Sequence, residues 1–74
     1  MIRFDLLQRA RDALGDVIGN FDDHQQGNEA LRLRASFEKA IDQGHPQRGE
    51  ILALLGRNPI AARDLVDELL RKAA

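Results

Sequence analysis

The spacing of the apolar residues constrains this chain more than any other feature of its sequence. Apolar side chains recur three or four residues apart in four separate stretches, and this spacing places them on one face of an α-helix. The composition agrees, because the chain has 11 Leu and 10 Ala but only 2 Val, 5 Ile and no Thr. Strands favour the β-branched residues that are scarce here, whereas helices favour Leu and Ala. The sequence therefore predicts an all-α chain.

Residues that start and stop helices separate the four stretches. We expect the pair Gly19-Asn20 to end the first helix and Asn28 to cap the second, after a polar connection. Asn58 and Pro59 are typical of the cap and the first position of a helix, so they predict the start of the last one. We expect one domain over residues 1–74, a compact bundle of three to four helices at about 3–18, 29–43, 47–55 and 59–72.

Charge and composition exclude several classes of protein. The chain has 11 basic and 12 acidic residues and a formal net charge of −1, which disfavours both a strongly basic nucleic-acid binder and an acidic mimic of DNA. The absence of Cys excludes disulfides and thiolate metal sites. The sequence contains no run of about 18 apolar residues and no signal-peptide pattern at its start. We therefore expect a cytoplasmic protein without a membrane span.

The residues that catalysis needs are few and far apart in the sequence. Ser36 carries the only hydroxyl side chain, and it lies within a predicted helix, away from both His24 and His45. A nucleophile needs an adjacent base, and zinc needs three or four converging ligands, so neither arrangement is indicated. A chain of this length is also too short to enclose a pocket of a few hundred cubic ångströms by itself. We expect no enzyme activity, no metal, no cofactor and no small-molecule substrate.

The third and fourth predicted helices carry more apolar surface than a short helix pair can hide. A domain of this size buries only about 60% of the surface of its unfolded chain, so association often adds stability. We therefore expect a small protein-interaction module, an adaptor, regulator or inhibitor of a larger protein, that also forms a homodimer. Leu54 is the test residue, because it faces away from Ile51 and Leu55 on a helix. The predicted partner-binding residues are Leu52, Leu54, Leu55, Arg57, Leu69 and Leu70.

A DNA-binding regulator is the alternative. Residues 50–70 read EILALLGRNPIAARDLVDELL, an apolar helix, a short polar turn with Pro and a helix with an A-x-x-L pattern. This segment resembles the first two helices of winged helix-turn-helix regulators, which read DNA with a third helix. The sequence ends at Ala74, so we expect no recognition helix after this segment. The resemblance implies phosphate contacts by Arg57, Arg63, Arg71 and Lys72.

Overall fold

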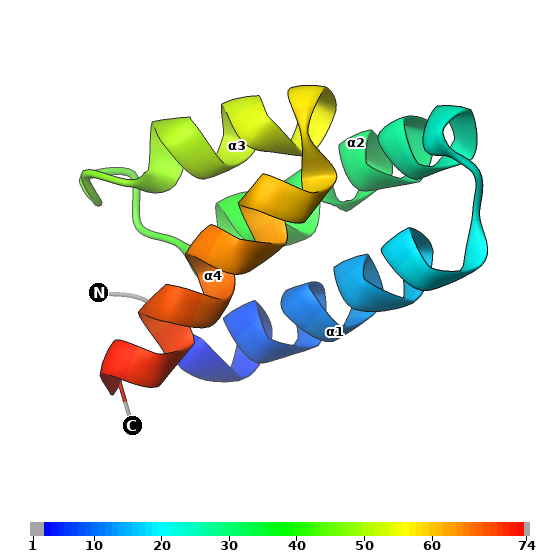
Figure 1. Ribbon diagram of the computed structural model, residues 1–74. Helices are drawn as coiled ribbons and strands as arrows, with labels where there is room; N and C mark the ends of the chain where they lie inside the picture. The colour runs from blue at the N-terminus through cyan, green and yellow to red at the C-terminus, as the bar shows by residue number, and fades with distance from the viewer. Residues whose placement is uncertain (1–2, 74) are drawn as a thin grey trace.

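The computed structural model describes residues 3–73, which form four α-helices and no strand (Figure 1). The helices are α1 (Phe4–Asn20), α2 (Asp23–Ala40), α3 (Arg48–Arg57) and α4 (Pro59–Ala73). The prediction of an all-α bundle is confirmed. Among the described residues, no helix has both the length and the apolar character that crossing a membrane requires.

The first two helices form an antiparallel hairpin that is fastened at both ends. Where α1 begins and α2 ends, the backbone N–H of Arg3 donates to the carbonyl of Ala40 at 2.9 Å. At the other end, Nε2 of Gln26 donates to the carbonyls of Ile18 and Phe21, at 2.8 and 2.6 Å. These bonds satisfy carbonyls that helix ends otherwise leave without a partner. They also fix the position of α2 along α1.

The other two helices cover one side of this hairpin. Helix α3 packs against α2, and α4 turns back from the end of α3 to pack against α1 (Figure 1). Asn58 alone joins the two helices, and its side chain accepts a hydrogen bond from the backbone N–H of Ala61 at 3.2 Å. This is the cap that the Asn58-Pro59 pair predicts. The start of α4 is therefore where the sequence places it.

The core lies between the hairpin and the α3–α4 pair, and every helix contributes to it. Burying each of its large apolar side chains stabilises the fold by about 1.5–3 kcal/mol. Gly56 allows α3 to approach α2, because a Cβ atom there would lie 3.1 Å from Cδ2 of Leu31. The largest fully buried side chains are those of Leu7, Leu14, Phe37, Ile41, Ile51, Leu55 and Val66.

The start of α2 corrects the sequence prediction. The helix begins at Asp23 instead of residue 29, so Asn28 lies inside it and caps nothing. Asp22 is the cap, and its Oδ1 accepts from the backbone N–H of Gln25 at 2.8 Å. The first turns of α2 carry no large apolar residue, so the apolar pattern could not extend the helix back to its true start.

The remaining helix ends differ from the predicted ones by one to three residues. Helix α1 ends at Asn20, within the predicted Gly19-Asn20 pair, and α3 continues to Arg57, two residues beyond its predicted end. Helix α2 stops at Ala40, three residues before the predicted end. There the backbone of Ile41 turns extended and its side chain is 1% exposed. The burial of this side chain in the core therefore ends α2 early.

Candidate interaction site

The core uses three of the six residues predicted to bind a partner. Leu52, Leu55 and Leu69 are at most 8% exposed and belong to the cluster of buried apolar side chains. Each lies on the face of its helix that points toward the hairpin. A side chain in this position reaches a partner only if the helices separate. At most three of the six predicted residues are therefore accessible to a partner.

The other three predicted residues do not form one patch. Leu54 and Leu70 are partly buried and pack against the core, and Arg57 is exposed. Leu70 borders a cleft between α4 and α1, about three turns of helix beyond the start of α4. Leu54 and Arg57 lie instead on α3, next to the turn that leads into α4. The structure thus separates Leu70 from the other two.

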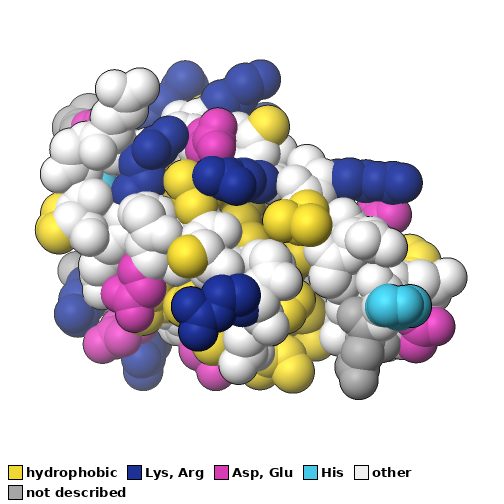
Figure 2. Space-filling model, turned by 90° about the horizontal axis from the view of Figure 1, so that it is seen from above, with side chains coloured by type: hydrophobic (Ala, Val, Ile, Leu, Met, Phe, Trp, Pro, Cys, Tyr) yellow, Lys and Arg dark blue, Asp and Glu magenta, His cyan; other side chains and the backbone are white. Residues whose placement is uncertain are grey.

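Exposed apolar side chains remain near the turn between α3 and α4. Seen from above, this face has apolar side chains in its middle with Lys and Arg side chains among them (Figure 2). Leu31 and Ile60 are each 49% exposed, but Leu31 already covers Gly56. Single exposed apolar residues are normal on a soluble protein. Leu31 and Ile60 therefore remain only partly accessible on this face.

A groove on the hairpin is the better candidate site. It has a volume of about 220 Å³ and runs between α1 and α2. Only these two helices line it, so it opens on the side of the hairpin that α3 and α4 leave uncovered. The lining residues are Leu6, Arg9, Ala10 and Ala13 from α1, and Leu33, Ser36 and Lys39 from α2.

Small side chains form the hollow. Ala10, Ala13 and Ser36 are too short to fill the space between the two helices, whereas Leu6 and Leu33 are partly buried against the core. An apolar surface that is neither filled nor covered loses the dispersion contacts that a close-packed interior provides. A side chain from another molecule would restore these contacts.

Two cations border the groove, one on each helix. Both Arg9 and Lys39 are exposed, and neither forms a hydrogen bond or an ion pair within the part of the chain that the structure describes. No carboxylate is among the described residues that line the groove. The site therefore combines an apolar floor with positive charge at its edges.

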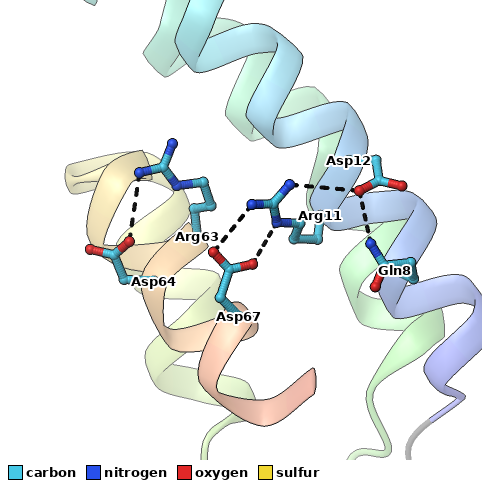
Figure 3. A network of polar contacts seen from close by, with 6 residues as sticks. All are labelled: Gln8, Arg11, Asp12, Arg63, Asp64 and Asp67. Carbon is cyan, nitrogen blue, oxygen red and sulfur yellow. Dashed lines mark hydrogen bonds and ion pairs between the residues drawn. The ribbon is translucent and has the colours of Figure 1, made fainter. Parts of the chain in front are cut away.

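The cleft between α1 and α4 has a volume of about 700 Å³ and is lined mostly by polar side chains, several of which pair with one another. Nε and Nη2 of Arg11 donate to Oδ1 and Oδ2 of Asp67, at 2.5 and 3.3 Å (Figure 3). The hydrogen bond with Asp67 raises the pKa of Arg11 above its ordinary value, against the opposing effect of burial. Asp12 lies 3.6 Å from Nη1 of Arg11 and accepts a hydrogen bond from Gln8 at 2.8 Å. This network holds α4 against α1.

The nucleophilic and imidazole side chains lie in different parts of the described chain. Ser36 borders the groove beside cations, and the groove's described lining includes no imidazole to activate it. His24 is exposed at the start of α2, and Nδ1 of His45 accepts from the backbone N–H of Gln47 at 3.1 Å. Within residues 3–73, no three His, Asp or Glu side chains are grouped so that they could hold a metal ion.

Sequence reasoning missed the groove because it assigned these apolar residues to the buried stripes of their helices. Leu6, Ala13 and Leu33 follow the same spacing as their fully buried neighbours. Periodicity gives the face of a helix but does not tell which part of that face a neighbouring helix covers. The one available signal was Lys39 and Arg9 beside small residues at the edges of these stripes.

Comparisons with protein families, with curated proteins and with solved structures found no match for this chain.

Proposed function

We propose that this chain is a small non-catalytic protein-interaction module that acts as an adaptor, regulator or inhibitor of a larger protein. The groove between α1 and α2 carries the proposal, because it is an apolar hollow on a molecule whose other large apolar side chains mostly serve the core. Grooves between two helices that present apolar side chains are one of the surfaces on which partner helices dock.

The chemistry around the groove supports binding over catalysis. Its polar groups are one hydroxyl and two cations, from Ser36, Arg9 and Lys39. General acid–base catalysis uses a pair of groups that exchange protons near neutral pH, usually His or a carboxylate with a shifted pKa. No His or carboxylate lines the groove within the described residues. Positive charge beside an apolar floor instead suits recognition of an oppositely charged partner.

The DNA-binding alternative receives less support from the charges on α4. Arg63 lies 3.6 Å from Asp64. Lys72 lies 3.6 Å from Glu68, which is one turn earlier on the same helix. Phosphate binding needs cations that face one strand of DNA together. Here acidic side chains stand among them, so α4 presents a mixed and nearly neutral surface.

Affinity capture from a lysate of the source organism tests this function, with and without nuclease treatment. We expect a protein to be retained in stoichiometric amount after nuclease digestion and to be identifiable by mass spectrometry. The Ala13→Trp variant, which fills the groove, should lose it, whereas Ala53→Trp on the exposed side of α3 should retain it. Capture that disappears with nuclease would contradict the proposal and favour the DNA-binding alternative.

A further inference from the structure

We infer that the groove between α1 and α2 binds an amphipathic helix of another protein, and that carboxylates flank the apolar ridge of this helix. The inference rests on the proposed function and adds to it the site and the chemistry of the partner. Three observations carry it. They are the shape of the groove, the two cations at its edges that have no ion pair among the described residues, and the scattered positions of the chain's own exposed apolar side chains.

The shape of the groove suits one ridge of a helix. Its volume of about 220 Å³ lies below the range of about 300–1,000 Å³ in which pockets enclose small ligands. It is also partly open and spans about two turns of each of the two helices that line it. Large apolar side chains at positions i, i+3 or i+4 and i+7 of a third helix form a ridge that fills such a space. Ala10, Ala13 and Ser36 leave room for this helix to approach closely.

The charges at the edges specify an acidic partner. Arg9 lies on the α1 side and Lys39 on the α2 side, so an approaching helix would meet one cation along each flank. The two glutamates of α2 are already engaged, because Glu29 pairs with Arg32 at 2.7 Å and Glu38 with Arg34 at 3.1 Å.

On α1, Asp5 lies one turn before Arg9, yet the two form no ion pair. The counter-charge for Arg9 and Lys39 is therefore missing from the described residues of the chain. Carboxylates on both flanks of the bound helix would supply it.

A second copy of this chain fits the groove poorly. Two grooves placed face to face would enclose an empty space and bring four cations together. The alternative is that one copy inserts a ridge into the groove of the next. The large apolar side chains that are most exposed, however, lie in different places along the fold, so they form no ridge of successive helical turns. They are Phe4, Phe21, Leu31 and Ile60.

Designed peptides test the inference directly on the unmodified chain. The probes are helix-stapled peptides of about 16 residues with three Leu on one ridge, with Glu on both flanks in one set and Lys in the matched set. Binding is measured by fluorescence anisotropy and located by NMR with the 15N-labelled protein. We expect the Glu peptides to bind about tenfold more tightly than the Lys peptides. The largest shifts should fall on Ala10, Ala13 and Leu33.

Charge reversal provides the matched variants. The double variant R9E/K39E should invert the preference, so that the Lys peptides bind about tenfold more tightly than the Glu peptides. The control is R57E/R71E, which reverses two exposed cations that also lack ion pairs within the described residues but do not line the groove. This control should retain the original preference. Circular dichroism checks that both variants remain helical.

Four results would overturn the inference. The first is equal binding of the two peptide sets, or no binding at millimolar peptide. The second is shifts that cluster on α3 and α4 instead of the groove. The third is a dimer in sedimentation that the groove-filling variant Ala13→Trp dissociates, which would assign the groove to a second copy. The fourth is that R9E/K39E still captures the cellular partner, which would mean that the module binds elsewhere: the proposed function stands and this inference fails.

Discussion

The two sides of the α1–α2 hairpin differ in what the fold has placed against them. On one side α3 and α4 cover the hairpin, and the cation of Arg11 meets the carboxylate of Asp67. On the other side nothing covers the groove within the described residues, and Arg9, two positions earlier on the same helix, has no partner. Arg11 thus has a counter-charge on the covering helix α4, whereas Arg9 at the uncovered groove has none among the described residues.

This difference separates residues that hold the fold together from residues that are free to bind something else. Side chains on the covered side are constrained by close packing, so changes there should reduce stability. Side chains that are more exposed on the open side, such as Ala13, Arg9 and Lys39, are less constrained, so changes to them should affect binding and leave stability nearly unchanged. Four pairs of substitutions test this distinction, in order of decreasing effect.

The largest effect is expected from a buried aromatic ring. Phe37 is 0% exposed in the core, so Phe37→Ala should lower the free energy of unfolding by about 3–5 kcal/mol. Urea unfolding followed by circular dichroism measures this loss. The control Phe21→Ala removes a ring that is 42% exposed and should cost less than about 1.5 kcal/mol. Equal losses would show that the core is not where the structure places it.

The next comparison adds volume on each side of the hairpin. Ala62 on α4 is 0% exposed, so Ala62→Leu should overpack the core and destabilise the protein by about 1–3 kcal/mol. Ala13 borders the open groove, and Ala13→Leu should change stability by less than about 0.5 kcal/mol. Thermal unfolding of the two variants distinguishes the sides. A large loss for Ala13→Leu would mean that the groove is closed in solution.

A smaller effect is expected at the turn that joins the two helices of the hairpin. Asp22→Ala removes the side-chain cap of α2 and should lower the free energy of unfolding by about 1 kcal/mol. Asn28 is the cap that the sequence predicted, but it lies within the span of α2 and its side chain is exposed to solvent. Asn28→Ala should therefore change the free energy of unfolding by less than about 0.5 kcal/mol. Chemical denaturation measures both variants, and the reverse order would support a helix that starts at residue 29.

The smallest effect is expected from the two arginines of α1. Arg11→Met breaks the contact with Asp67 at a partly exposed position and should cost about 0.5–1 kcal/mol, less in high salt. Arg9→Met removes a cation without an ion pair among the described residues and should leave the unfolding midpoint unchanged. The two variants differ only in position, so equal midpoints in low salt would contradict the assignment of Arg11 as a link between α1 and α4.

The parts of the fold that could be predicted from the sequence are those that local chemistry decides. The apolar spacing gave four helices, and Asn58 with Pro59 located the start of α4, because cap and helix preferences act within a few residues. The start of α2 was wrong for a related reason. Two residues suited to cap a helix, Asp22 and Asn28, lie in one polar stretch. The local sequence does not decide between a helix that starts at residue 23 and a shorter one that starts at residue 29.

The candidate site could not be predicted in the same way, because it depends on how the helices pack. Leu52, Leu55 and Leu69 were expected to bind a partner, but α3 and α4 turn them toward the hairpin and bury them. Conversely, Ala13 and Leu33 follow a core pattern but remain at the edge of an open groove. A sequence shows how much apolar surface a helix carries. Which neighbour covers that surface is decided by contacts between residues far apart in the chain.

The bonds that fasten the hairpin have a consequence for how this surface can change during evolution. At one end the link joins two backbone groups, those of Arg3 and Ala40, and at the other Gln26 binds backbone carbonyls. Five residues form these bonds. Only Gln26 acts through its side chain, and none of the five lines the groove. Part of what holds the two helices together is therefore independent of the residues that a partner would touch. Substitutions along the groove can alter its specificity while the backbone that carries it keeps its shape.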